Sequence, residues 1–120
     1  MIEITRDNIC IDRDFEIDEL WEPVSIRFYV EDWFDAGEKF DIGSIEDGEK
    51  WVNLYAYYNP LENYLRMEYD VETDISCIPA NFYEPTPAER ETIISMLEEC
   101  CKKETGMTCS EWLQKELKEK

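Results

Sequence analysis

The sequence predicts an α+β fold, a mostly antiparallel sheet of three to five strands followed by two C-terminal helices packed on one sheet face. Two patterns carry this prediction. Apolar and polar residues alternate in several segments before residue 85, as strands require, whereas apolar residues recur at helical spacing in residues 86–120. A chain of 120 residues is near the commonest domain size, so we expect a single domain over 1–120.

The strands are predicted from their two-residue alternation and from the turn residues between them. Near the N-terminus, residues 2–4 or 9–11 fit an edge strand, and residues 15–21 fit either a short helix or a strand. Residues 59–63, which begin Asn-Pro, have the composition of a short hairpin loop. The clearest alternation lies in residues 24–30, 51–58 and 65–71.

The first helix is predicted from its two ends. Thr86 and Glu89 form a capping box, in which each side chain accepts a backbone N–H at the helix start, and Pro87 occupies the first helical position. Gly106 supplies the stop. Between the ends lies an apolar stripe that consists of Ile93, Ile94, Met96, Leu97, Cys100 and Cys101.

A second, shorter helix begins at another capping box. Thr108 and Glu111 have the same spacing as the first pair. We expect Trp112, Leu113 and Leu117 to face inward from this helix.

The charge of the chain restricts its partners. Asp and Glu number 30 against 12 Lys and Arg, and with no histidine the formal net charge is −18, of which residues 1–85 contribute −16. Such a surface repels nucleic acid and anionic lipid and attracts basic proteins. A hydrophobic fraction of 43%, with 13% aromatic residues, argues that the chain folds rather than remaining disordered.

Cysteine usage and the N-terminal sequence predict a cytoplasmic protein with free thiols. The five cysteines are odd in number and irregularly spaced, and the chain is charged from residue 3, unlike a signal peptide. Cys100, Cys101 and Cys109 are close in sequence, but no histidine is available to complete a zinc site. We therefore interpret these three as small buried apolar residues and expect neither a metal nor a cofactor.

No catalytic pattern is present in the sequence. Without histidine, the usual serine and cysteine triads are excluded, and the four glycines do not form a phosphate-binding loop. Paired carboxylates occur by chance among 30 acidic residues and so have no specificity. The sequence predicts that the protein is not an enzyme.

Two sets of residues are candidate partner-binding surfaces. The acid-rich segment 35–49 lacks the spacing of a calcium-binding loop and is interpreted as a solvated loop. It offers Glu38, Asp41, Glu46, Asp47 and Glu49, and a second acidic group offers Asp12, Asp14, Glu16, Asp18, Glu19 and Glu22. The aromatic set is Tyr29, Trp51, Tyr55 and Tyr57, opposite the aliphatic face of the strands. That aromatic face is either a binding surface or a second core layer beneath the N-terminal segment.

These features lead to two functional hypotheses. In size, acidity and lack of catalytic residues the chain resembles, as a class, DNA-mimic antirestriction and anti-CRISPR proteins and the immunity proteins of nuclease toxins. The resemblance implies an inhibitor or decoy that binds a basic nucleic-acid-handling protein. The alternative is a protein–protein interaction or homodimerisation module that uses the aromatic sheet face. Salt distinguishes them, because charge pairing weakens as ionic strength rises and aromatic burial does not.

Overall fold

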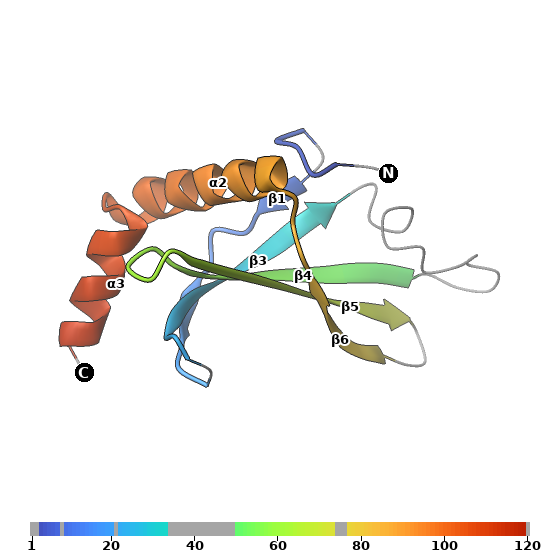
Figure 1. Cartoon of the computed structure of the whole chain (residues 1–120), viewed down its shortest axis with the longest axis horizontal. Coiled ribbons are helices and arrows are strands. Elements are labelled where there is room, and N and C mark those ends of the chain that lie inside the picture. The colour runs from blue at the N-terminus through green and yellow to red at the C-terminus, as the bar shows by residue number, and fades with distance from the viewer. Residues whose placement is uncertain (1–2, 8, 21, 34–49, 74–76, 120) are drawn as a thin grey trace.

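The structure, a computed structural model, describes residues 3–7, 9–20, 22–33, 50–73 and 77–119. Within these ranges, residues 31–33, 50–52, 71–73 and 77–81 are described by their backbone alone. The predicted α+β architecture is confirmed: an antiparallel sheet is followed by two helices (Figure 1).

The sheet of the described chain has the strand order β1-β3-β4-β5-β6, and β2 pairs with β3 beside β1. Every pairing is antiparallel. The strands are β1 (Ile9–Ile11), β2 (Glu16–Asp18), β3 (Ser25–Trp33), β4 (Lys50–Asn59), β5 (Tyr64–Thr73) and β6 (Cys77–Tyr83). The three long alternating segments of the sequence therefore form the centre of the sheet, and the ambiguous segment 15–21 contains a strand.

The β4–β5 hairpin closes as its turn residues predict. The side-chain oxygen of Asn59 accepts the N–H groups of Leu61 and Glu62 at 2.8 and 3.1 Å. Asn63 adopts a left-handed backbone conformation with φ of 51°, which asparagine tolerates better than most residues. These contacts fix the register of the long β4–β5 pair, which runs from Lys50↔Thr73 to Asn59↔Tyr64.

Both helices begin at the predicted capping boxes. Helix α2 (Pro87–Thr105) starts after Thr86, and α3 (Cys109–Lys118) starts after Thr108, with both reciprocal hydrogen bonds present in each box. Gly106 ends α2 at φ of 76°, in the left-handed region that glycine adopts readily. The N–H of Gly106 donates to the carbonyl of Lys102 at 2.9 Å.

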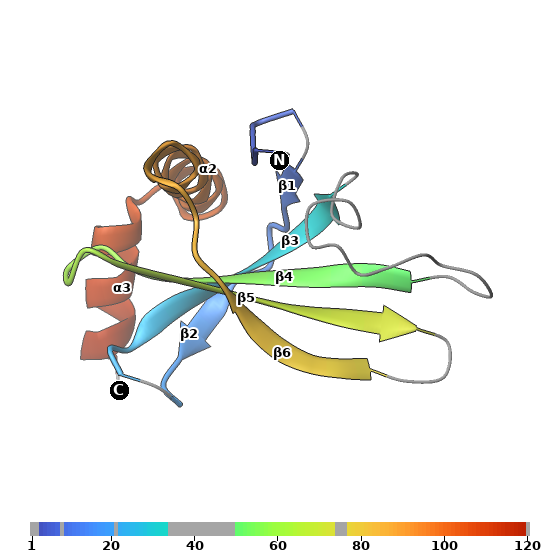
Figure 2. The same cartoon turned by 45° about the vertical axis from the view of Figure 1, so that its right-hand side comes forward.

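The core lies between the two helices and one face of the sheet (Figure 2). It contains sheet residues such as Phe28, Leu54 and Met67 and helix residues such as Leu97 and Leu113, all almost fully buried. The buried members contributed by the helices are Ile93, Leu97, Cys101, Cys109 and Leu113, together with the polar Glu89.

The inward-facing residues predicted for α3 are only partly correct. Leu113 is buried, and Trp112 packs edge-on against Phe15 with ring centroids 5.0 Å apart. The prediction for Leu117 is wrong: its side chain is 40% exposed. One turn separates Leu117 from the buried Leu113, so burial along this side of α3 ends before its last turn.

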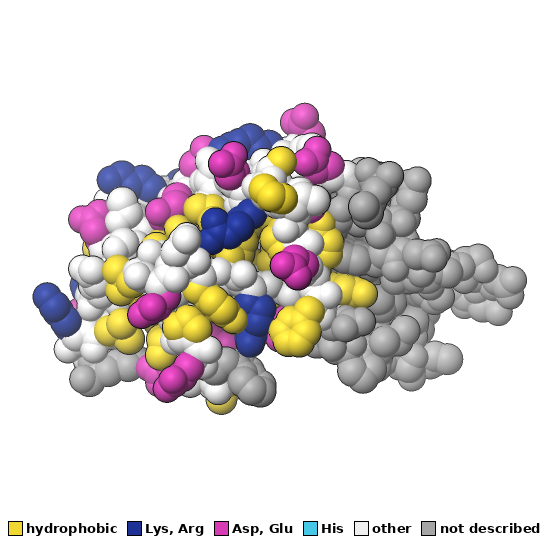
Figure 3. Space-filling view, in the orientation of Figure 1, with side chains coloured by type: hydrophobic (Ala, Val, Ile, Leu, Met, Phe, Trp, Pro, Cys, Tyr) yellow, Lys and Arg dark blue, Asp and Glu magenta, His cyan; other side chains and the backbone are white. Residues whose placement is uncertain are grey.

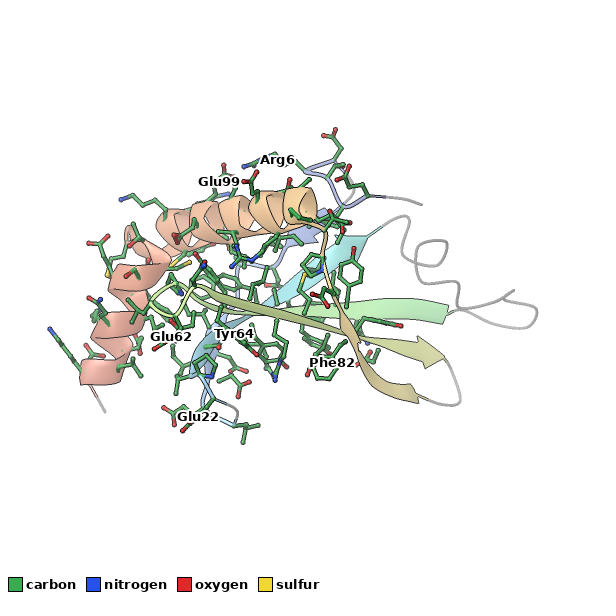
Figure 4. All side chains as sticks on the ribbon, viewed as in Figure 1. Arg6, Glu22, Glu62, Tyr64, Phe82 and Glu99 are labelled. Carbon is green, nitrogen blue, oxygen red and sulfur yellow. The ribbon has the colours of Figure 1, made fainter. Side chains whose placement is uncertain are left out.

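The described N-terminal residues join the helix side of the molecule. Ile4 and Ile9 belong to the main core. The guanidinium of Arg6 binds both carboxylate oxygens of Glu99 on α2, at 2.7 and 2.9 Å (Figure 4). Residues 3–7 are therefore held against α2 and do not cover the opposite face of the sheet.

Candidate functional site

The sheet face that points away from the helices carries the candidate site. No helix of the described chain lies over this face (Figure 2). We call it the open face. Its described side chains, given by the strand alternation and register, are Glu16, Arg27, Tyr29, Asn53, Tyr55, Tyr57, Arg66, Glu68, Asp70 and Phe82.

The strand register arranges these side chains in three rows across the sheet, because directly paired residues share a face. The first row contains Glu16, Arg27, Tyr57 and Arg66. The second contains Tyr29, Tyr55, Glu68 and Phe82. The third contains Asn53 and Asp70. Tyrosines therefore lie at the centre of the face, with charged groups around them.

A hydrogen-bonded chain holds one side of the tyrosine cluster. The hydroxyl of Tyr29 donates to the side-chain oxygen of Asn53 at 2.7 Å, and the Asn53 amide donates to the carboxylate of Asp70 at 2.7 Å. Asn53 is only 9% exposed, so its polar atoms need such partners. The rings of Tyr29 and Tyr55 lie 5.4 Å apart between centroids. Tyr29 and Tyr55 are thus held in position by contacts within the open face.

Two arginines pack against the same cluster. The Arg66 guanidinium lies over the ring of Tyr57, 4.4 Å from its centroid, and its Nε lies 3.6 Å from the carboxylate of Glu68. Arg27 forms an ion pair with Glu16. The positive charges of the face are therefore balanced locally, and a guanidinium stacked on tyrosine is already part of it.

The environment of the tyrosines favours their neutral form. Burial raises the pKa of Tyr55 to about 12, and the negative charge of Asp70 adds to the effect. Burial also raises the pKa of Tyr57, with a further contribution from Glu68 that Arg27 opposes. Both hydroxyl groups therefore remain protonated at neutral pH.

Phe82 extends the open face onto β6 and was not predicted from the sequence. Figure 4 shows its side chain on β6, and the side chain is 70% exposed. The backbone of Phe82 pairs with Glu68, which places it in the same row as Tyr29 and Tyr55. In the view of Figure 3, hydrophobic side chains are interleaved with acidic and basic ones over the region of β5 and β6. The sequence feature that could have indicated Phe82 is the Asn-Phe-Tyr sequence at the end of residues 77–83, which form a strand paired with the alternating residues 65–71.

A cleft of about 540 Å³ opens at the β2–β3 edge of the open face. Asp12, Asp14 and Glu16 of the predicted acidic group line it together with Tyr29 and Tyr55 of the predicted aromatic set. The structure thus brings part of both predicted sets to one place. The remaining lining residues are Arg13, Phe15, Arg27, Thr105 and Trp112.

A second cavity, of about 330 Å³, lies at the β5–β6 side. Arg66 and Arg90 line it with the aromatic residues Tyr64, Phe82 and Tyr83. The Arg90 guanidinium donates to the carbonyl and side-chain oxygens of Asn63 at 3.1 and 3.0 Å, which commits it to the hairpin turn. The two cavities therefore differ in net charge: three carboxylates and two arginines line the first, whereas two arginines and one carboxylate, Glu84, line the second.

Several predicted residues fall outside these observations. The acidic loop residues lie outside the described residues: Glu38, Asp41, Glu46, Asp47 and Glu49. The backbone of Trp51 pairs with Glu72 in β4 and β5, but its side chain is not described. Asp18 ends β2, and Glu19 and Glu22 lie in the β2–β3 connection beside Leu20, which is strongly exposed.

The C-terminal cysteines are packing residues in the structure. Cys101 and Cys109 are fully buried, and Cys100 is partly buried. Burial raises the pKa of Cys100 to about 11 and raises the pKa of the other two thiols as well, which disfavours the thiolate that metals bind. Within the described ranges, no group of three His, Cys, Asp or Glu side chains has the arrangement of a metal site.

None of the described helices has the length and apolar character needed to cross a membrane. Comparison of the chain with protein-family models, curated proteins and solved structures finds no match. The functional argument therefore rests on the chemistry of the open face and its cleft.

Proposed function

We propose that the chain is a small, acidic, non-enzymatic binding protein that docks a basic protein on the open face of its sheet. The observation that carries the proposal is the row of Tyr29, Tyr55 and Phe82, an aromatic surface that no described helix covers. A hydrogen-bonded chain through Asn53 holds this surface in position before any partner arrives. Preorganised groups lose less conformational freedom on binding, which favours affinity.

The composition of the open face supports a protein as the ligand. Tyrosine, arginine and other large side chains at the centre of an interface contribute most of the binding energy in protein complexes. Here the partly exposed Tyr55 lies at the centre beside Tyr57, which Arg66 covers, and Arg27 flanks both. Phe82 adds an apolar side chain that is 70% exposed and available for burial.

The net charge supports a basic partner over a second copy of the chain. Two copies would each bring a formal charge of −18 to the interface, and their repulsion opposes association. A basic protein is instead attracted at long range and docks faster. Nucleic-acid-handling proteins present basic grooves, so occupying one would make this chain an inhibitor or decoy. That is the biological role we propose.

The state of the thiols supports a reducing location. Cys10, Cys100, Cys101 and Cys109 are all free. Disulfides are rare in the cytoplasm and common outside it. We therefore place the proposed binding function in the cytoplasm.

A matched pair of variants tests the docking surface. Phe82→Ala removes an exposed ring from the open face, whereas Leu61→Ala removes a side chain that is 45% exposed in the β4–β5 turn. Both changes are at the surface, where effects on stability are usually within about 0.5 kcal/mol. Tagged wild-type protein and the two variants would each be used to capture proteins from cell lysate and eluted with increasing NaCl.

We expect a basic protein that the wild type and Leu61→Ala retain and that Phe82→Ala loses, with affinity reduced about tenfold. The decoy role predicts in addition that wild-type chain displaces nucleic acid bound to the captured basic protein. Equal retention by all three proteins would place the contact elsewhere and refute the proposed surface. Self-association that depends on Phe82, measured by sedimentation, would replace the basic partner with a second copy.

A further inference from the structure

The cleft at the β2–β3 edge brings carboxylates and tyrosine rings together at one end of the open face. We propose that this cleft receives the guanidinium group of an arginine side chain from the basic partner. The inference rests on the proposed function and specifies the chemical group that the partner presents. The volume of the cleft, about 540 Å³, falls within the range of roughly 300–1,000 Å³ that is usual for binding clefts.

Backbone hydrogen bonds fix the carboxylates at the cleft. The N–H of Asp12 donates to the carbonyl of Tyr29 at 2.8 Å, so this acidic segment is tied to the strand that carries the tyrosine. The Asp12 carboxylate accepts the N–H of Asp14 at 2.7 Å, which forms a tight turn between the two acids. The fold therefore sets the position of the Asp12 carboxylate and of the Asp14 backbone relative to Tyr29.

The charges that line the cleft leave net attraction for a cation. Three carboxylates, Asp12, Asp14 and Glu16, face two cations, Arg13 and Arg27. Arg27 and Glu16 neutralise each other through their ion pair. Neither Asp12 nor Asp14 forms an ion pair within the described part of the chain. The formal charge of −18 on the whole chain strengthens this attraction.

The aromatic walls favour arginine over lysine. Tyr29 and Tyr55 both line the cleft, with ring centroids 5.4 Å apart. A guanidinium is planar and weakly hydrated, so it stacks on an aromatic ring while it also binds a carboxylate, whereas an ammonium group is a compact, strongly hydrated charge. The same face already contains this contact, since Arg66 lies over Tyr57 at 4.4 Å.

Apolar side chains in the cleft suit the aliphatic stem of the incoming arginine. Phe15 and Trp112 both contribute to the lining and pack edge to face, with ring centroids 5.0 Å apart. Arginine side chains commonly pack their methylene groups along apolar surface while the charged end reaches polar groups. The cleft thus offers a contact for each part of the side chain.

The test is an NMR titration of the isotopically labelled full chain with small probes at low salt. N-acetyl-arginine amide should shift backbone amides at residues 12–16, 29 and 55. N-acetyl-citrulline amide, a neutral molecule of nearly the same shape, should shift them little, and N-acetyl-lysine amide should bind more weakly than the arginine probe. Asp14→Asn should weaken arginine binding about threefold. The control Glu62→Gln removes one charge from the exposed β4–β5 turn and should leave the affinity unchanged.

Three results would overturn the inference: equal shifts with citrulline, arginine shifts spread over the acidic surface, or equal effects of Asp14→Asn and Glu62→Gln. The two proposals fail separately. Loss of probe binding in the cleft, while Phe82→Ala still abolishes partner capture, would remove only the arginine receptor. Specific probe binding with partner capture that survives Phe82→Ala would support the receptor and refute the docking face.

Discussion

The two faces of the sheet are stabilised in different ways. The helix-side face carries aliphatic and aromatic residues such as Phe28, Leu54 and Met67, which α2 and α3 cover almost completely. The open face carries tyrosines, arginines and carboxylates that are held by hydrogen bonds, ring contacts and ion pairs with one another. Burial stabilises the first face, and specific polar contacts order the second.

Under the proposed binding function, this difference separates the residues that stabilise the fold from those that bind a partner. Truncating an apolar side chain on a covered face lowers the free energy of unfolding, because buried apolar area is lost and a cavity remains. On the open face water can replace part of a lost contact, so the cost to stability is smaller. Substitutions on the helix side should therefore lower stability, and substitutions on the open face should mainly alter binding.

The largest effect is expected in the covered core. Leu97→Ala removes a fully buried side chain of α2. The free energy of unfolding should fall by about 2–5 kcal/mol. Urea unfolding followed by circular dichroism measures this change. A loss close to that of a surface substitution would mean that α2 does not cover the sheet as described.

Substituting one buried polar residue on each face compares how much each face loses in stability. On the helix side, Glu89 accepts hydrogen bonds from the N–H groups of Ile4 and Thr86 and from the Tyr83 hydroxyl. Glu89→Ala leaves these three donors without that acceptor and should cost about 3 kcal/mol, at on the order of 1 kcal/mol each. Asn53→Ala on the open face should cost about 1 kcal/mol, since water can reach Tyr29 and Asp70. Equal decreases in the free energy of unfolding would show that the open face excludes water as fully as the core does.

The ionisation of one tyrosine on each face at alkaline pH provides a second comparison. Burial raises the pKa of Tyr55 on the open face and of Tyr58 on the helix side to about 12, from 10.0. The folded state therefore prefers the neutral hydroxyls. Their contribution to stability is complete below pH 10 and is lost as the pH rises from about 10 to 12.

Tyr55→Phe and Tyr58→Phe each remove one hydroxyl, and each should reduce this alkaline loss in urea unfolding at pH 9 and pH 11. Absorbance at the phenolate band should show one fewer high-pKa tyrosine in each variant. If Tyr55 instead ionises near pH 10 in the folded protein, the open face is more solvated than its contacts indicate.

The smallest expected effect is that of salt on stability. The formal charge of −18 causes self-repulsion in the folded chain, and added ions screen it. The melting temperature should therefore rise between low salt and 0.5 M NaCl. A decrease would show that ion pairs such as Arg6–Glu99 outweigh the repulsion.

Local sequence signals predicted most of the fold. Alternation identified β3, β4 and β5, and the capping boxes identified both helix starts. Strand β6 was missed because it contains Pro79 and lacks clean alternation. An edge strand tolerates proline, since its outer N–H groups need no partner in the sheet. The exposure of Leu117 depends on where the tertiary contacts of α3 end, which spacing along the helix does not reveal.

The candidate site was predicted in its residue types and missed in its geometry. Alternation placed Tyr29, Tyr55 and Tyr57 opposite the core. It did not show that Phe82 completes their row, because that residue belongs to the missed strand. The meeting of Asp12 with Tyr29 depends on a backbone bond between an edge segment and β3, which no local pattern encodes.

Site-specific crosslinking tests the central claim most directly. Photoreactive benzoylphenylalanine would be placed at position 82 on the open face or, as a control, at position 117 on the last turn of α3. Both positions are exposed, but position 82 lies on the open face and position 117 lies on α3. Our account predicts that position 82 crosslinks to a basic protein in cell lysate and that position 117 does not. Crosslinking of that protein from position 117 alone would contradict it, because the helices would then form the interface.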